Sequence, residues 1–267
     1  MSDNSPYGKK SLGQHWLDDL SVLENIAESV EVSPEDVILE IGPGPGTLTK
    51  ILSERARQVI AVELDERLVA KLRTLGLPNV QIIQQDILQF DLTGLPAGYK
   101  VVANIPYYLT SNLLRTLCES RNPFSHAAIL VQKEVAERVA AKPGAMSLLS
   151  VSVQFYCEVS LGQVVLAELF TPPPKVDSQV LILRHRSRPL FEVDTKQFFW
   201  LVKAGFAQRR KTLANSVSGG LHIERGQAAE LLENAGISPS ARAQTLSLEQ
   251  WHKLYQVFTP LLFPSNT

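Results

Sequence analysis

A short turn near the middle of the chain is the first group of residues that could carry out chemistry. It runs from Asn104 through Ile105 and Pro106 to Tyr107, and its proline ends the strand predicted before it. An exocyclic amine on an aromatic ring is a poor nucleophile because its lone pair is delocalised. The Asn104 side-chain oxygen and the Ile105 carbonyl, as acceptors for its two N–H bonds, would free that lone pair for attack. Tyr107 offers a face on which a flipped-out base stacks, so the turn predicts a site that activates a nucleobase amine.

A glycine-rich loop stands between a buried apolar run and a helical pattern. In residues 39–48 the glycines follow the order G-x-G-x-G and begin at Gly42. A dinucleotide-binding loop has the order G-x-G-x-x-G, whose third place here falls on Thr47. The two prolines of the loop have no N–H to offer a pyrophosphate. We therefore predict a loop that lets a cofactor without phosphates approach the backbone closely.

Polar residues also end the strands predicted after this loop. Glu63 follows Gly42 by 21 residues, a position from which a carboxylate can accept hydrogen bonds from both hydroxyls of a ribose. Asp86 could accept a hydrogen bond from an adenine amino group, and Asn104 ends the next strand. Each acid by itself could simply cap the helix that follows it. Together they favour a nucleoside site, and S-adenosylmethionine is a nucleoside with a cationic centre and no phosphate.

Strands and helices alternate over the first half of the chain, and this alternation places the polar residues at strand ends. Strict alternation predicts a parallel sheet covered by helices on both faces. Ligands of such sheets bind at the carboxyl ends of the strands. The predicted strands are 36–42, 58–65, 80–86, 100–104 and 126–132, and the predicted helices are 47–57, 66–75 and 109–119.

The pattern changes after about residue 145. Residues 148–159 and 176–186 read as long strands of an antiparallel hairpin at one edge of the sheet. We therefore expect two domains, a catalytic domain over residues 1–188 that binds S-adenosylmethionine and a helical domain over residues 189–267. The helical patterns of the second domain are 195–206, 208–217, 225–235 and 247–258.

The composition of the 267-residue chain, with 45% hydrophobic residues, is that of a globular protein with a sizeable core. No run reaches the roughly 18 apolar residues of a membrane span, and the first residues lack the apolar stretch of a signal peptide. Cys118 and Cys157 match no metal-binding spacing. We expect two reduced thiols, no metal site, no membrane partner and a cytoplasmic protein.

Positive charge is concentrated in one segment although the net charge is only −1. Residues 184–211 carry eight Lys or Arg against two acidic residues. Arg209, Arg210 and Lys211 stand together at a predicted helix start, and we expect two of them to contact phosphates. A local basic face on a slightly acidic protein suggests a polyanionic partner, although an ordinary solvated surface has the same composition.

Several of these stretches resemble one enzyme family, the ribosomal RNA small-subunit adenine N6,N6-dimethyltransferases. The matching stretches run in order from residue 9 to residue 216 and are KKSLGQHWL, LEIGPGPGTLT, AVELD, QQDIL, NIPYYLTS, LVQKEVAERVAAKPG, FTPPPKVDSQVL and FAQRRKTLANS. The last four separate the chain from methyltransferases in general. The resemblance implies a class I S-adenosylmethionine-dependent methyltransferase fold: a Rossmann-like α/β domain with a seven-stranded sheet, one strand reversed, and a small all-α C-terminal domain.

The resemblance also implies a substrate and a set of site residues. The expected substrate is a pair of neighbouring adenines in a hairpin loop near the 3′ end of small-subunit rRNA, within an immature ribosomal particle, and the expected enzyme is a monomer. The RNA-binding residues would be Arg209, Arg210 and Lys211. The catalytic residues would be Asn104, Ile105, Pro106 and Tyr107, with Phe170 covering the other face of the base stacked on Tyr107. The cofactor-binding residues would be His15, Leu17, Gly42, Glu63, Asp86 and Asn104.

Three other functions share parts of this pattern. The large-subunit rRNA adenine methyltransferases, linked to antibiotic resistance, have the same fold and turn, but GQHWL and FAQRRKTLANS resemble the small-subunit branch. A non-catalytic RNA-binding or transcription factor with this fold would be expected to lose the glycine loop or Asn104, and both are intact. Methyltransferases that act on DNA adenine or protein glutamine usually have Asp or Asn followed by Pro-Pro-Tyr at this turn.

Overall fold

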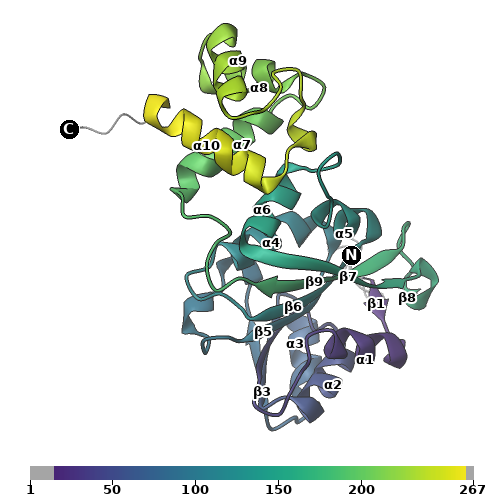
Figure 1. The fold of residues 1–267 in the computed structure, drawn as a ribbon. Coiled ribbons are helices and arrows are strands. Elements are labelled where there is room, and N and C mark those ends of the chain that lie inside the picture. Colours follow the sequence, from purple (N-terminus) through teal and green to yellow (C-terminus); the bar gives the residue numbers. More distant parts are fainter. Residues whose placement is uncertain (1–14, 263–267) are drawn as a thin grey trace. The chain divides into compact units, whose positions relative to one another are not determined.

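The computed structural model describes residues 15–262, which form two compact units (Figure 1). Among these residues the first unit takes those up to Glu137 together with Cys157–Arg186, and the second takes Arg138–Tyr156 and the chain from Ser187 onward. The sequence suggested a single division between residues 188 and 189, whereas in the structure the second unit also includes an earlier segment. Residues 138–156 precede the last strands of the first unit in the chain but pack with the second unit.

A seven-stranded sheet in the order β4-β3-β2-β5-β6-β9-β7 forms the centre of the first unit. Strands β2 to β6 run parallel to one another, whereas β9 runs antiparallel to both of its neighbours, β6 and β7. The class I sheet with one reversed strand is therefore confirmed. The strands are β2 (Val37–Ile41), β3 (Gln58–Glu63), β4 (Val80–Gln84), β5 (Lys100–Asn104), β6 (His126–Gln132), β7 (Cys157–Val165) and β9 (Ser178–His185).

Helices pack their apolar faces on this sheet. Ile26 of α1 and Leu52 of α2 are fully buried in one cluster with Ile38 of β2 and Val102 of β5. Such continuous apolar strands are typical of parallel sheets that are covered on both faces. The helices of this part of the chain are α1 (Leu20–Glu28), α2 (Thr47–Arg55), α3 (Glu66–Arg73), α4 (Thr110–Cys118) and α5 (Lys133–Val139), with short 3-10 turns η2 (Ile87–Gln89), η3 (Leu92–Gly94), η4 (Tyr107–Leu109) and η5 (Ala167–Leu169).

The strand expected over residues 148–159 is wrong over most of its length. Residues 148–156 form helix α6 (Leu148–Tyr156), and β7 begins only at Cys157. Ser147 starts the helix, since its hydroxyl accepts a hydrogen bond from the Ser150 N–H at 3.1 Å. Val151 and Phe155, four residues apart, enter the core of the second unit from one face of this helix. Tertiary burial thus outweighs the β-propensity of a segment rich in valine.

A small two-stranded ribbon that the sequence did not reveal lies beside the main sheet. Strand β1 (Trp16–Leu17) pairs antiparallel with β8 (Phe170–Thr171), so that Leu17 lies opposite Phe170 and Trp16 opposite Thr171. Segments more than 150 residues apart in sequence are thereby joined. Two-residue strands carry no periodic pattern, which is why only the pairing itself defines them.

The second unit is helical around a core that contains Phe155, Phe198, Trp251 and Phe258. A Cβ on Gly205 would lie 2.4 Å from the Trp251 ring, so this glycine allows the close packing of the core. No helix in residues 15–262 is long and apolar enough to cross a membrane. The helices, besides α6, are α7 (Thr195–Phe206), α8 (Leu213–Leu221), α9 (Arg225–Asn234) and α10 (Leu248–Leu262), with the 3-10 turn η6 (Ala243–Thr245).

The helix expected over residues 208–217 begins later than its pattern indicated. Helix α8 starts at Leu213, after Thr212 in an extended conformation, and Arg209, Arg210 and Lys211 lie in the turn that precedes it. The expectation that these three cations open a helix is therefore wrong. Their side chains are all exposed, which is the arrangement that hydration of three neighbouring cations favours.

Candidate active site

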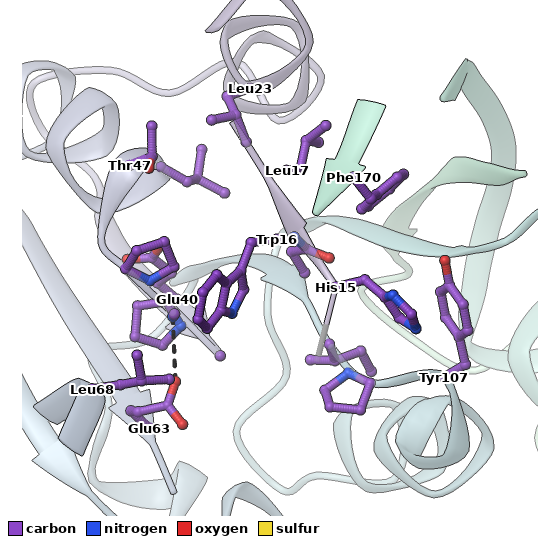
Figure 2. Close-up of a pocket in the computed structure, with 18 residues that line it drawn as sticks. His15, Trp16, Leu17, Leu23, Glu40, Thr47, Glu63, Leu68, Tyr107 and Phe170 are labelled. Atoms are coloured by element: carbon purple, nitrogen blue, oxygen red, sulfur yellow. Dashed lines mark hydrogen bonds between the residues drawn. The ribbon is translucent and has the colours of Figure 1, made fainter. Parts of the chain in front are cut away.

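The carboxyl ends of β2, β3 and β5 open into a pocket that the β1–β8 ribbon also lines (Figure 2). The structure thus brings together residues from five separate stretches of the sequence. Those named from the sequence that line the pocket are His15, Leu17, Gly42, Glu63, Asn104, Ile105, Pro106, Tyr107 and Phe170.

Asp86 lies in a second pocket that adjoins the first. Gly42, Glu63, Ile105 and Pro106 line both pockets, so the two form neighbouring compartments around the same loop. One Asp86 oxygen accepts a hydrogen bond from the Leu88 N–H at 2.9 Å and caps η2, which leaves the other oxygen for a ligand. The other residues of this pocket are Ile41, Val62, Leu64, Gln85, Ile87, Tyr108 and Leu109.

Gly42 links the glycine loop to the turn at Asn104. Its φ of +68° lies in the left-handed region, which favours glycine. A Cβ built on Gly42 would lie 3.1 Å from the main-chain oxygen of Asn104, tighter than ordinary van der Waals contact. A side chain at position 42 would therefore disturb both the loop and the turn.

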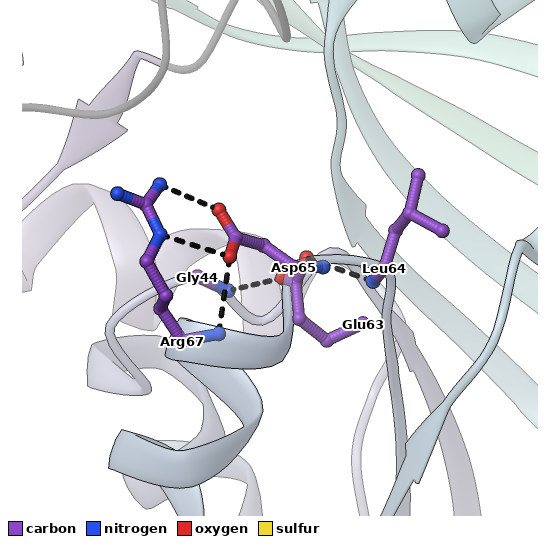
Figure 3. Close-up of polar contacts among 5 residues, drawn as sticks. All are labelled: Gly44, Glu63, Leu64, Asp65 and Arg67. Atoms are coloured by element: carbon purple, nitrogen blue, oxygen red, sulfur yellow. Dashed lines mark hydrogen bonds and ion pairs between the residues drawn. The ribbon is translucent and has the colours of Figure 1, made fainter. Parts of the chain in front are cut away.

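Glu63 holds the glycine loop from the end of β3 (Figure 3). One carboxylate oxygen accepts from the Gly44 N–H at 3.3 Å, and the other accepts from the N–H groups of Leu64 and Asp65 at 2.8 and 2.9 Å. Burial raises the pKa of Glu63, and these three hydrogen bonds oppose that rise. Asp65 caps α3 and pairs with Arg67 at 2.8 Å.

The Asn104 side-chain amide and the Ile105 carbonyl have no hydrogen-bond partner among residues 15–262. Both residues line the first pocket, and Asn104 is only half-buried. The turn is held elsewhere, because the Pro106 carbonyl accepts a hydrogen bond from the Leu109 N–H at 3.0 Å. Two acceptors in a fixed turn are what a bound amine with two N–H groups requires.

Tyr107 is fixed at both its hydroxyl and its ring. Its hydroxyl lies 2.8 Å from the hydroxyl of Ser178, a fully buried residue at the start of β9. Its ring lies nearly parallel to that of His15, with centroids 6.0 Å apart and planes at 21°. Burial raises the pKa of Tyr107, so its phenol stays protonated. The ring can therefore present a fixed face to the pocket.

His15 is held by the segment that follows β8. Its Nδ1 lies 2.7 Å from the Pro172 carbonyl oxygen, and because a carbonyl can only accept, Nδ1 carries the proton. Phe170 is buried beside Leu17, its partner in the ribbon, and is 3% exposed. Figure 2 shows both Phe170 and His15 directed toward the pocket that Tyr107 lines.

Three residues of the site were not assigned a role from the sequence. Trp16 lines the pocket and would be 3.7 Å from a Cβ on Gly44, and Ser178 holds Tyr107. Glu40, in β2, lines the pocket with neither carboxylate oxygen hydrogen-bonded. Its place before the first glycine was visible in the sequence, but its isolation depends on how the strands pack.

The basic cluster Arg209–Lys211 belongs to the second unit, where it lies in an exposed turn. None of the ion pairs found among the described residues involves these three side chains. Their charges are therefore available to a polyanion.

The model of one protein family, described as ribosomal RNA adenine dimethylase, matches residues 7–259. The chain belongs to this family. An S-adenosylmethionine-dependent rRNA adenine dimethyltransferase with a class I fold, as expected from the sequence, is thereby confirmed.

Curated relatives agree with this assignment. A protein of Dehalococcoides mccartyi strain CBDB1 is 44% identical over 252 residues, which cover 92% of this chain and 87% of the relative. A protein of Shouchella clausii strain KSM-K16 is 45% identical over 260 residues, which cover 92% of this chain and 88% of the relative. Both are named ribosomal RNA small subunit methyltransferase A.

Two solved structures are similar over both units. A dimethyladenosine transferase from Plasmodium falciparum is 27% identical, covers 92% of this chain and 98% of its own, and has a TM-score of 0.81. The 23S rRNA methyltransferase ErmE is 31% identical, covers 91% of this chain and 98% of its own, and has a TM-score of 0.73. A dimethyladenosine transferase and a 23S rRNA methyltransferase thus share the fold of this chain.

Proposed function

We propose that this enzyme dimethylates N6 of two adjacent adenines in a hairpin loop near the 3′ end of small-subunit rRNA. The observation that carries the proposal is the pair of unpaired acceptors at Asn104 and Ile105, beside Tyr107 and in the same pocket as the glycine loop. An amine-activating turn, a base-stacking ring and a nucleoside site are the three parts that such a reaction needs.

The pocket fits S-adenosylmethionine in charge and shape. Gly42 and Gly44 leave room where a Cβ would meet Asn104 or Trp16, and the buried carboxylates of Glu40 and Glu63 suit a cation. Glu63 would hold the ribose, Asp86 the adenine amino group in the adjoining pocket, and the other cofactor residues would be His15, Leu17, Gly42 and Asn104. When bound, the cofactor supplies a methyl group on a sulfonium, which is an excellent leaving group.

The turn would position the adenine amine. Asn104 and Ile105 would each accept one of its N–H bonds, and Pro106 fixes the geometry of both acceptors. Tyr107 would stack on one face of the base and Phe170 would cover the other. A methylated exocyclic ammonium is acidic and loses its proton to water, so positioning and release of the lone pair are most of the catalysis.

The expected setting is an immature small ribosomal particle in the cytoplasm, on which the enzyme works as a monomer. Two of the three cations Arg209, Arg210 and Lys211 would contact rRNA phosphates from the second unit, which we propose as an RNA-binding domain, and the third would be structural. The first unit would be the catalytic domain, since all residues of both pockets belong to it.

The alternative substrate is large-subunit rRNA, the substrate class in the name of ErmE. The curated relatives at 41–45% identity carry a small-subunit name, which favours the small-subunit proposal. Mass spectrometry of both rRNAs from a strain without this protein decides between them. We expect dimethyladenine to disappear from the small-subunit rRNA and to return with the wild-type gene but not with Asn104→Ala. Loss from the large-subunit rRNA alone would overturn the proposal.

A further inference from the structure

Glu40 is a buried acid that has no part in the methyl-transfer step proposed above. It is the fourth residue of β2, its side chain is 1% exposed, and it lines the first pocket. Neither carboxylate oxygen has a hydrogen-bond partner among the described residues. An ionised carboxylate without water, cation or N–H donor is very unfavourable, and the usual outcome is that such a group takes up a proton.

Within the part of the chain that the structure describes, the neighbours of Glu40 provide no positive charge. In the sheet it lies opposite Ala61 of β3 and Val102 of β5. The Thr49 hydroxyl of α2 is near enough to favour the ionised form of Glu40, although the geometry between the two groups falls short of a hydrogen bond.

The charged neighbour of Glu40 is another acid. Glu63 of β3 lines the same pocket, and its negative charge disfavours ionisation of Glu40. His15 is the titratable group that lines this pocket from the N-terminal segment. Burial, with Glu63 adding to it, raises the pKa of Glu40 to about 8, while Thr49 opposes the rise.

Glu63 differs from Glu40 in its hydrogen bonds. Three main-chain N–H groups donate to the Glu63 carboxylate and stabilise its charged form. When two carboxylates are so close that ionising both is unfavourable, the one with more hydrogen-bond donors carries the charge and the other keeps its proton. Glu63 is therefore the charged member of the pair and Glu40 the neutral one.

The ligand of this pocket has the opposite charge. S-adenosylmethionine carries a sulfonium and an ammonium against one carboxylate, so it brings one net positive charge into a site with a low dielectric constant. An opposite charge within a few ångströms favours the ionised form of a buried acid. The cofactor thus supplies a counter-charge that residues 15–262 do not provide to Glu40.

We propose that Glu40 is protonated in the cofactor-free enzyme and releases its proton to solvent when S-adenosylmethionine binds. This inference rests on the placement of the cofactor proposed above. Cofactor binding would then be coupled to pH. Between the pKa of Glu40 in the complex and its pKa in the free enzyme, about 8, each rise of one pH unit should tighten binding about tenfold, because one proton leaves for each cofactor bound.

Calorimetric titration with S-adenosylmethionine at pH 6.5, 7.0 and 7.5 tests this coupling. Each titration is run in two buffers with different enthalpies of ionisation, which yields the number of protons released. For the wild type we expect about one proton per site, and a dissociation constant that falls about tenfold per pH unit. Glu40→Gln preserves the shape of the neutral acid, and we expect it to bind with no proton release and no such pH dependence.

Infrared difference spectra of the wild type, with and without cofactor, give a second measurement that does not depend on the variant. We expect the carbonyl band of a neutral carboxylic acid to disappear on binding. Cofactor binding with no proton release and no loss of this band would overturn the inference and leave the proposed function intact. Absence of cofactor binding would instead contradict the placement of the cofactor, and the inference with it.

Discussion

The Glu63 carboxylate has two tasks at the scale of one residue. The sequence suggested a ribose acceptor at a strand end. In the structure the same carboxylate also accepts hydrogen bonds from three main-chain N–H groups, one in the glycine loop and two directly after β3. A substitution at this position should therefore affect cofactor binding and stability together.

Glu63→Ala should weaken S-adenosylmethionine binding by at least about tenfold, since charge-assisted hydrogen bonds contribute roughly 1.5–3 kcal/mol each. It should also lower the melting temperature, because buried N–H groups lose their acceptor. Calorimetry and thermal unfolding measure the two effects. Glu63→Gln is the matched control, since its amide oxygen can still accept. Unchanged cofactor affinity in Glu63→Ala would remove the ribose assignment.

Asn104→Ala should abolish most methyl transfer while RNA binding survives. The lost acceptor acts on the amine chiefly in the transition state, so kcat should fall by at least about a hundredfold with little change in KM for RNA. Single-turnover kinetics on purified rRNA particles measures this. A kcat within a few-fold of the wild type would contradict amine activation by Asn104.

Gly42→Ala should impair both cofactor binding and methyl transfer. The added Cβ would press on the main-chain oxygen of Asn104 at 3.1 Å, and the φ of +68° would be strained by about 1–2 kcal/mol. Gly98→Ala is the matched control, because Gly98 has a φ of +75° with nothing within 4 Å of its Cβ. Equal loss of activity in the two variants would show a general stability effect instead of the contact with Asn104.

At the scale of elements, the segment from β8 to the start of β9 positions three residues of the pocket, Leu17, His15 and Tyr107. Phe170 pairs with Leu17, the Pro172 carbonyl holds His15, and Ser178 holds the Tyr107 hydroxyl. The reversed strand β9 anchors this segment in the sheet. The segment therefore sets the positions of the rings between which a base would bind.

Tyr107→Phe should keep much of the activity, because stacking requires the ring, whereas Tyr107→Ala should lose most of it.

The hydroxyl contact between Tyr107 and Ser178 should contribute about 1 kcal/mol to stability. Ser178→Ala and Tyr107→Phe should each lower stability, and the double variant should lower it by less than their sum. Fully additive effects in denaturant unfolding would show that the 2.8 Å contact is not a stabilising bond.

At the scale of the whole molecule, each unit has its own cluster of charge. In the first unit the charged Glu63 lines the pocket, joined by Glu40 once the cofactor is bound, and the basic turn at Arg209 belongs to the second unit. A cation as cofactor and a polyanion as substrate suit this separation, although the net charge is only −1.

Arg209→Ala combined with Arg210→Ala should weaken binding to the ribosomal particle and flatten its salt dependence by roughly one unit of slope per lost phosphate contact. Cofactor affinity should not change, because residues of the first unit line the cofactor pocket. Binding across a salt series, beside a cofactor titration, measures both. Arg225→Ala, in an exposed position of the same unit, is the control. An unchanged salt slope with a lower melting temperature would make the cluster a structural element.

Features that depend on local order in the chain were determined by the sequence alone. The alternation of strands and helices, the glycine loop and the polar strand ends at Glu63, Asp86 and Asn104 all follow from spacing within a few residues of each element. Parallel strands bring their carboxyl ends to one edge, so these residues had to meet there. The place of the turn from Asn104 to Tyr107 at the end of β5 could be inferred for the same reason.

Features that depend on contacts between distant segments were decided only by the tertiary structure. Residues 148–156 read as a strand, but they form a helix because Val151 and Phe155 are buried in the second unit. The pairing of Trp16 with Thr171 and the bond between Tyr107 and Ser178 join segments with no shared local pattern. The state of Glu40 has the same origin, since neighbouring strands and helix α2 exclude water from it without supplying a counter-charge.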